Sequence, residues 1–450
     1  MKRVLIVGSD FAPSSLPPAT RIRFFASHLA DFGWEPIVLS TRPQFYDWPT
    51  DAENECLLPE SLKVVRTGAW SPRWTRKIGF GDVGMRSLWK HWKAIKQICG
   101  EQKIDLLFIP VPPYVPMVLG RMAHKKFGIP YVIDYIDPWV SEYYWQVPRD
   151  QRPPKWPLAY AMSRIVEPVA LRKVAHITGV SKGTTDGVVV RYPWLSSDNA
   201  SEIPYGAEPG DFQYIRKHPR SNSIFKRGGA LIHLSYIGAC IPGMYPAVRA
   251  LFQAVALGLQ REPELFNRLR FHFVGTSYSS KPEKNEGVEA IADEEGISHL
   301  VNETRQRVAY LDSLQLMLDS DALLLIGSDE AHYTASKVFP YLLSKRPLII
   351  IFHEKSSVNE ILRGATAAHS ITFSSAEKVT DKVEQIYDAV KAALSADQVN
   401  GEANLEIYTT RSMAGRLAES FDRAVSAPTQ PEKSVTGKRM PLTPTGSATP

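Results

Sequence analysis

The sequence predicts an α/β protein made of two Rossmann-like, doubly wound domains that face a central cleft. Strand-like apolar runs alternate with helix-like segments through most of the chain, and such alternation is typical of parallel sheets covered by helices on both faces. The alternation occurs in two blocks, which meet in a polar segment near residues 207–229. A chain of 450 residues is also long enough for two such domains.

The first block opens with a β-α-β unit. Residues 2–7 form a continuous apolar run that ends at Gly8, as expected of a buried parallel strand. Residues 21–32 place apolar side chains at helical spacing, and Gly33 is suited to the position just after a helix. Residues 36–39 form the second strand, and the usual right-handed crossover makes the two strands parallel.

The same pattern recurs along the chain. We expect further strands at residues 104–109, 130–133, 176–180, 231–237, 270–274, 322–326 and 348–352, and helices at residues 87–98 and 246–260. The predicted units are an N-terminal domain over 1–205, a C-terminal domain over 206–408, a helix over 409–425 that packs back on the first domain, and a tail over 426–450. The tail contains five prolines and almost nothing to bury, so we expect it to be disordered.

Composition excludes several classes of protein. The chain is 44% apolar and 22% charged, which is ordinary for a globular protein. Its three cysteines are scattered and form no CxxC pair, so we expect a reducing, cytoplasmic location. Apolar runs fall far short of the ~20 residues that a membrane-spanning helix needs, and the run near the N-terminus is too short for a signal peptide.

Charge and tryptophan are concentrated in the first half. Residues 63–126 contain 13 basic and 3 acidic residues, and all ten tryptophans precede residue 195. Within residues 70–98, a helix would carry Leu88, Trp89, Trp92, Ile95 and Ile98 on one side and Lys90, His91, Lys93 and Lys96 on the other. This pattern suits a peripheral contact with an anionic membrane, but equally a helix packed on a sheet. It matches no nucleic-acid recognition module, so we expect no nucleic-acid partner.

Motifs of several common α/β enzymes are absent. The first strand is followed by no GxGxxG, and the second strand by no carboxylate for a ribose, which excludes a dinucleotide-dependent dehydrogenase. The sequence also lacks GxxxxGK[ST], HExxH and GxSxG. We expect neither a metal site nor another cofactor.

Polar loops follow three of the predicted strands, where ligands bind in open α/β sheets. Asp134 and Asp137 could position or deprotonate a hydroxyl, or could cap a turn. Ser336 and Lys337 begin a predicted helix and could bind an anion such as a diphosphate, or could be a helix cap and a surface lysine. Gly238 offers a further backbone turn that could face a phosphate.

The order of these motifs resembles that of the retaining, nucleotide-sugar-dependent glycosyltransferases of family 4, which have the GT-B fold of two facing Rossmann-like domains. The similar stretches extend over about residues 1–425; they are residues 3–7 with Arg21, 132–139, 203–208, 236–238, 273–275, 336–342 and 347–349. Residues 203–208, with the sequence IPYGAE, are similar to the interdomain IPNGVD of that family.

The resemblance implies that the C-terminal domain binds a nucleoside diphosphate sugar and the N-terminal domain binds a glycan or lipid-linked acceptor. The implied donor-binding residues are Gly238, Gly275, Tyr310, Glu330, Ser336 and Lys337, with residues 308–310 beside the base. The implied acceptor-binding residues are Asp10, Arg21 and Trp139, and the implied catalytic residues are Asp134, Asp137 and Lys337. The family needs no metal, and its proteins act by positioning the substrates and stabilising the leaving diphosphate.

The sequence departs from the family at its pair of glutamates, which would fall at His332 and Pro340. Glu330 and Asp329 are close enough to replace the first glutamate, but no carboxylate replaces the second, which binds ribose. Two further differences are Leu16-Pro17-Pro18 in place of a Gly-Gly pair, and the absence of a basic pair after Gly238, for which Arg249 lies too deep in its helix.

Three functions are therefore compatible with the sequence. The first is an active retaining glycosyltransferase of cell-surface polysaccharide or glycolipid biosynthesis, either free in the cytoplasm or peripheral on the inner face of the membrane. The second is a catalytically silent partner of another transferase, and the third is a nucleotide-sugar epimerase with the same fold.

Overall fold

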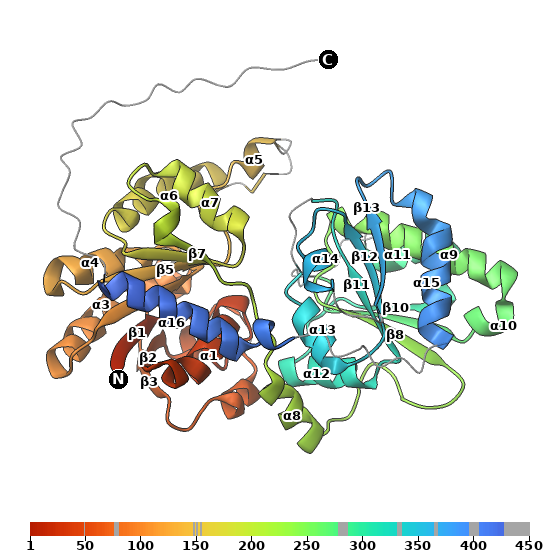
Figure 1. Cartoon of the computed structure of the whole chain (residues 1–450), viewed down its shortest axis with the longest axis horizontal. Coiled ribbons are helices and arrows are strands. Elements are labelled where there is room, and N and C mark those ends of the chain that lie inside the picture. The colour runs from red at the N-terminus through yellow and green to blue at the C-terminus, as the bar shows by residue number, and fades with distance from the viewer. Residues whose placement is uncertain are drawn as a thin grey trace, which may run out of the picture.

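The computed structural model describes residues 1–48, 50–75, 81–146, 149, 152–153, 155–277, 287–330, 335–363, 368–395 and 405–426. Two α/β domains lie side by side (Figure 1), as the sequence predicts. The first contains a seven-stranded sheet of order β3-β2-β1-β4-β5-β6-β7, and the second a six-stranded sheet of order β10-β9-β8-β11-β12-β13. Neighbouring strands pair in parallel in both sheets.

The N-terminal sheet has helices on both faces. Its strands are β1 (Lys2–Val7), β2 (Trp34–Thr41), β3 (Lys63–Thr67), β4 (Leu106–Val111), β5 (Tyr131–Tyr135), β6 (His176–Gly179) and β7 (Ala200–Glu202). Its helices are α1 (Pro17–His28), α2 (Pro72–Thr75), α3 (Val83–Glu101), α4 (Met117–Phe127), α5 (Tyr143–Gln146), α6 (Trp156–Leu171) and α7 (Lys182–Arg191). Strand side chains alternate between a core formed with α1 and a core formed with α3 and α4.

The C-terminal domain repeats this plan. Its strands are β8 (Ile232–Ile237), β9 (Leu269–Val274), β10 (Val301–Thr304), β11 (Ala322–Ile326), β12 (Leu348–His353) and β13 (Ala368–Phe373). Its helices are α8 (Pro209–Lys217), α9 (Tyr245–Arg261), α10 (Pro263–Phe266), α11 (Val288–Glu294), α12 (Tyr310–Asp319), α13 (Val338–Ser344), α14 (Val358–Ile361) and α15 (Val383–Ser395).

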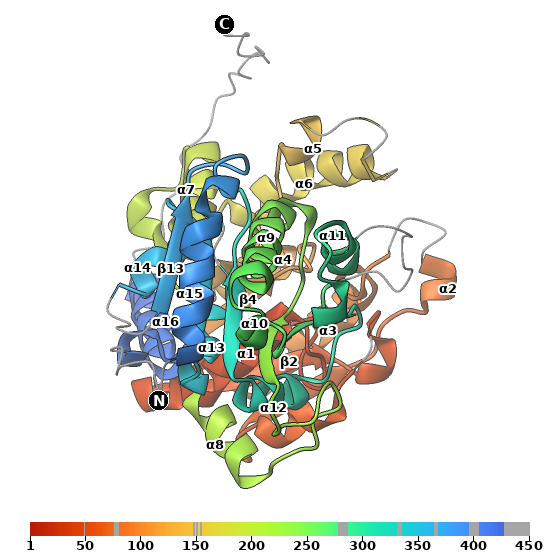
Figure 2. The same cartoon turned by 90° about the vertical axis from the view of Figure 1, so that its right-hand side faces the viewer.

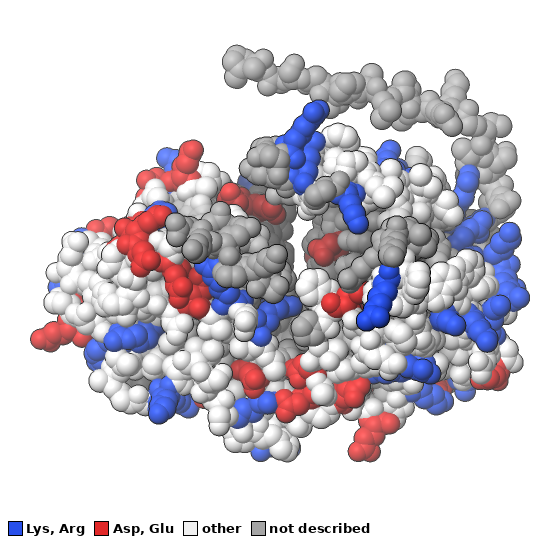
Figure 3. Space-filling view, turned by 180° about the vertical axis from the view of Figure 1, so that it is seen from behind, with Lys and Arg blue, Asp and Glu red and all other residues white. Residues whose placement is uncertain are grey.

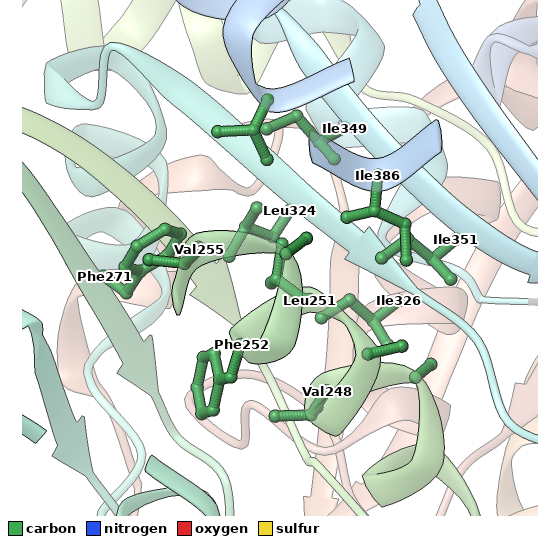
Figure 4. Close-up of a cluster of buried hydrophobic side chains, with 14 of the residues drawn as sticks. Val248, Leu251, Phe252, Val255, Phe271, Leu324, Ile326, Ile349, Ile351 and Ile386 are labelled. Atoms are coloured by element: carbon green, nitrogen blue, oxygen red, sulfur yellow. The ribbon is translucent and has the colours of Figure 1, made fainter. Parts of the chain in front are cut away.

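Close packing against the sheet explains why the C-terminal helices form where they do. Val248, Leu251 and Val255 of α9 recur at helical spacing and lie against Leu324, Ile326, Ile349 and Ile351 of the sheet, beside Ile386 of α15 (Figure 4). Burial of each such aliphatic side chain contributes roughly 1.5–3 kcal/mol. This core holds the strand ends, and therefore the loops that follow them, in fixed positions.

The last helix, α16 (Thr410–Ser426), returns to the N-terminal domain and lies across it (Figure 1). The Phe421 ring contacts the Trp34 and Phe108 rings edge-on, with centroids 5.2 Å away in each case. Ion pairs from Lys2 to Asp422 and from Arg411 to Asp31 flank this contact. From residue 427 onward, the predicted tail lies outside the described residues.

The chain crosses between the domains at two points that are bonded to each other. The Ala207 N–H donates to the Tyr408 carbonyl (2.8 Å), and the Thr410 N–H donates to the Ala207 carbonyl (2.9 Å). A Cβ atom on the neighbouring Gly206 would lie 2.8 Å from the Thr410 nitrogen, so only glycine fits. None of the helices in the described part of the chain is both long and apolar enough to span a membrane.

Candidate active site

A cavity of about 320 Å³ lies between the domains, where the strands of the C-terminal sheet end. This is the edge at which parallel sheets bind ligands, because the loops that follow the strands meet there. Seen from behind, the surface is hollowed between the two domains (Figure 3). Ser15, Pro17, Thr20 and Phe24 form the N-terminal wall of the cavity, and the interdomain linker contributes Tyr205 to Glu208. The C-terminal wall includes Gly238, Gly275, Arg307, Val308, Tyr310, Ser336, Lys337 and Pro340.

Lys337 is the most unusual residue of this cavity. Its side-chain nitrogen is buried and has no hydrogen-bond partner among the residues that the structure describes. It lies 3.7 Å from the centroid of the Tyr236 ring, a cation–π contact that compensates only part of the lost hydration. Burial lowers the pKa of Lys337 to about 7. A group in this state gains from any anion that enters the cavity.

Gly238 provides the space beside this nitrogen. Its backbone has φ of 122°, in a region that side chains rarely adopt, and a Cβ atom there would lie 3.1 Å from the Lys337 Nζ. The Gly238 N–H already donates to the Val274 carbonyl (2.8 Å), and the Gly275 N–H donates to the Thr304 carbonyl (2.7 Å). The N–H groups of both glycines are therefore engaged within the domain.

The predicted helix after Ser336 begins later than expected. Ser336 is exposed at the cavity, and α13 runs only from Val338 to Ser344. Ser336 and Lys337 therefore precede the first turn of α13 rather than forming it.

Tyr310 lines the cavity, but its hydroxyl group is used elsewhere. The hydroxyl donates to Asp211 (2.6 Å), which also forms two hydrogen bonds with Arg23 of α1 (2.8 and 2.6 Å). Burial and the neighbouring Asp211 raise the pKa of Tyr310 well above its usual value. The Tyr310 N–H donates to Asp51 of the N-terminal domain (3.0 Å). Tyr310 therefore joins the two domains through its hydroxyl group and its backbone N–H.

Arg21 and Asp134 do not line the cavity, in contrast to the predicted acceptor-side roles. They form a buried pair with two hydrogen bonds of 2.6 and 2.9 Å, and their side chains are 1% and 0% exposed. Asp134 also accepts from Thr178 (2.7 Å), and Arg21 donates to the carbonyls of Ile203 (2.8 Å) and Pro204 (3.2 Å). These contacts hold the start of the interdomain linker, so the geometry assigns the pair a structural role.

Asp137 and Trp139 lie outside the cavity, on the same N-terminal sheet edge. Asp137 is exposed, and Trp139 stacks on the Tyr114 ring with centroids 5.1 Å apart. Asp10 follows β1 and is buried, 7% exposed. Burial, with Asp47 and Asp82 nearby, raises the pKa of Asp10 to about 7.

Of the two positions where the family has its glutamate pair, only the second is among the described residues. His332 lies outside the described residues, whereas Pro340 lines the cavity. Glu330 is exposed and is not among the lining residues. The carboxylate that does line the cavity in the described part of the chain is Glu208, the last residue of the IPYGAE stretch, which was not among the predicted site residues. It accepts from Thr410 and lies 2.7 Å from His28.

The helical face predicted to contact a membrane is largely part of the core. Ile95 and Ile98 of α3 are buried, and Trp92 packs against them. His91, predicted to be solvated, is wholly buried, which lowers its pKa to about 4. Three tryptophans of residues 70–98 remain exposed, namely Trp70, Trp74 and Trp89 (46%, 73% and 57%). The described residues include no group of three or more side chains placed to hold a metal ion.

No known family model matches the sequence, and no curated protein matches it either. Solved structures with the same fold are numerous. A UDP-forming trehalose-phosphate synthase of Burkholderia xenovorans has a TM-score of 0.61 at 11% identity, covering 95% of this chain and 100% of that one. The Anabaena protein HepE, crystallised with UDP and glucose, has a TM-score of 0.59 at 14% identity, covering 94% and 100%.

A glycosyltransferase of Rickettsia africae is similar to the same extent, with a TM-score of 0.58 at 12% identity over 95% of this chain and 99% of that one. At such low identities, these similarities establish the architecture alone. The chain has the GT-B fold, in which two Rossmann-like domains face a cleft.

Proposed function

We propose that this protein is a retaining glycosyltransferase that binds a nucleoside diphosphate sugar in the interdomain cavity. The observation that carries the proposal is the buried Lys337 side-chain nitrogen beside Gly238, which has no hydrogen-bond partner among the described residues and therefore lacks a bonded counter-charge there. A diphosphate would supply that charge at the place where a leaving group needs stabilisation. The Anabaena protein of the same fold was crystallised with UDP and with UDP-glucose, which supports this class of ligand.

The proposed chemistry depends on Lys337 and on positioning. Bond cleavage between the anomeric carbon and the diphosphate leaves an additional negative charge on the departing oxygen. A protonated Lys337 next to that oxygen stabilises the charge more in the transition state than in the bound substrate, which lowers the barrier. The acceptor hydroxyl enters on the same face, so that its proton passes to the leaving diphosphate and the configuration is retained.

We assign the acceptor to the N-terminal wall of the cavity. Ser15 and Thr20 offer hydroxyl groups there, and Phe24 offers an apolar surface for a sugar ring. Asp137 and Trp139 would contact the more distant part of a glycan or lipid-linked acceptor, as expected in cytoplasmic synthesis of a cell-surface polysaccharide or glycolipid.

Pro340 favours a second candidate, a catalytically silent partner of another transferase. Pro340 lines the cavity at the position of the ribose-binding glutamate and cannot accept a hydrogen bond from a ribose hydroxyl through its side chain. The epimerase has less support, because Glu208 is the carboxylate that lines the cavity in the described part, and His28 and Thr410 already engage it.

Thermal unfolding with nucleoside diphosphates and their sugars tests the donor site first. A ligand at ~100 times its dissociation constant adds about 2.7 kcal/mol to the free energy of unfolding. We expect one base to raise the melting temperature, and Lys337→Gln to remove the effect. Sugar transfer by the purified chain then separates the active enzyme from the silent partner, because nucleotide binding alone does not show turnover.

A further inference from the structure

Helix α6 exposes an apolar stripe on the surface of the N-terminal domain. Leu158, Ile165 and Val169 are 68%, 68% and 54% exposed, and Ala161 lies exposed between them. Their spacing of three, four and four residues places all four side chains along one side of the helix. Trp145 of the adjacent α5 is also 55% exposed. We call this surface, formed by Trp145, Leu158, Ala161, Ile165 and Val169, the α6 ridge.

The orientation of α6 is fixed from its opposite side. Glu167 is fully buried and accepts from the hydroxyl groups of Tyr135 (3.0 Å) and Tyr192 (2.6 Å), and from Arg191 (3.1 Å). Ala170 and Leu171 on the same side pack in the domain core. Rotation of α6 about its axis would break these buried bonds, so the ridge cannot turn inward. A helix that is apolar on both sides indicates that its outer side has a partner.

The charges around the ridge are basic. Residues 149–173 contain six Lys and Arg residues against Asp150 and Glu167. Arg149, Lys155, Arg164 and Arg172 are exposed, whereas Glu167 is buried and Asp150 lies outside the described residues. Arg152 lies over the Trp145 and Trp156 rings, 5.9 and 5.8 Å from their centroids. Apolar and tryptophan side chains flanked by Arg and Lys are typical of a helix that lies in the surface of an anionic membrane.

We propose that the α6 ridge docks the protein on the surface of an anionic bilayer. Figures 1 and 2 both place α5 and α6 at the edge of the molecule opposite α8, where a flat surface can reach them. A second copy of the chain fits less well, because a two-fold contact through the ridge would bring the same basic side chains together. The proposal does not depend on the donor site, and it locates membrane contact on α6 rather than on residues 70–98.

Co-sedimentation with vesicles tests the proposal without any nucleotide. We expect the full chain to bind vesicles that contain phosphatidylserine, and to bind phosphatidylcholine vesicles at least tenfold more weakly. The double substitution Leu158→Ser with Ile165→Ser should lower binding to the anionic vesicles at least tenfold. The double substitution Lys155→Gln with Arg164→Gln should lower it about tenfold at low salt.

Two controls separate the ridge from other surfaces. Ile407→Ser removes an apolar side chain that is 56% exposed, outside the ridge, and Trp74→Ser with Trp89→Ser alters the segment 70–98. Both should bind like the wild type, and all variants should keep its melting temperature because the replaced side chains are exposed. The proposal fails if neither vesicle binds, if only the tryptophan variant loses binding, or if the ridge variant instead abolishes a dimer in sedimentation velocity.

Discussion

Each domain contains a buried basic side chain, Arg21 in the first and Lys337 in the second, and the two differ in their hydrogen-bond partners. Arg21 in the N-terminal domain forms two hydrogen bonds with Asp134 and two more with linker carbonyls. Lys337 in the C-terminal domain has no hydrogen-bond partner in the described part of the chain and contacts a tyrosine ring. Removing the partner of a paired buried charge is costly, whereas a buried basic group without a hydrogen-bond partner stands to gain from a bound anion.

The largest effect should follow from breaking the satisfied pair. Asp134→Ala leaves the Arg21 guanidinium buried without its carboxylate, which we expect to lower the free energy of unfolding by roughly 3–5 kcal/mol. Denaturant unfolding measures this. The matched double variant Arg21→Met with Asp134→Leu should recover most of the loss because no charge remains buried. A loss below 1 kcal/mol for Asp134→Ala would contradict the structural role.

The second effect concerns the unsatisfied cation. Lys337→Gln removes a charge-assisted contact worth about 1.5–3 kcal/mol, so nucleoside diphosphate affinity should fall roughly 10- to 100-fold. Calorimetric titration measures the affinity, and Lys378→Gln, which alters a lysine that is 65% exposed, is the matched control. The unfolding free energy of Lys337→Gln should not fall, in contrast to Asp134→Ala. Unchanged affinity would remove Lys337 from the donor site.

A smaller effect is expected at Gly238. Alanine there must adopt φ of 122° and place its Cβ atom 3.1 Å from the Lys337 nitrogen. We expect a loss of about 1–2 kcal/mol in unfolding free energy, together with weaker nucleotide binding. Gly100→Ala, where a Cβ atom would meet nothing within 4 Å, is the control. Wild-type stability and affinity for Gly238→Ala would show that the close approach is unnecessary.

The smallest effect should come from Tyr310→Phe. Loss of the hydrogen bond to the buried Asp211 should cost about 1 kcal/mol of stability, while nucleotide affinity stays within threefold of the wild type. Unfolding and titration of the same preparation give both values. A large loss of affinity with unchanged stability would mean that the hydroxyl group binds the ligand after all.

How far the sequence predicts this fold depends on burial. The central strands were predicted because β1, β4 and β11 are continuous apolar runs. The edge strands β3 and β10, with sequences KVVRT and VNET, were missed because they are half-exposed and carry no such run. Their pairing is determined by neighbouring strands, which local sequence does not reveal.

The sequence predicted the C-terminal wall of the candidate site better than its N-terminal side. Gly238, Gly275, Tyr310, Ser336 and Lys337 line one cavity because each follows a parallel strand or begins a helix next to one. The sequence could not show that Asp134 and Asp137 have different roles, since both lie near the end of β5. Strand alternation turns Asp134 toward α1, and its partner Arg21 lies 113 residues away. Only the tertiary structure brings the two together.

The role of Lys337 at the diphosphate is tested most directly by the number of protons taken up when a nucleoside diphosphate binds at pH 8. With a pKa of about 7, Lys337 is mostly neutral at that pH in the free protein, and a bound diphosphate stabilises the ammonium form. Affinity should therefore fall as the pH rises above 7. Titration calorimetry in buffers of different ionisation enthalpy should give an uptake close to one proton for the wild type and close to none for Lys337→Gln. Tight binding with no proton uptake, or with the same uptake in both proteins, would contradict the assignment of Lys337 to the diphosphate.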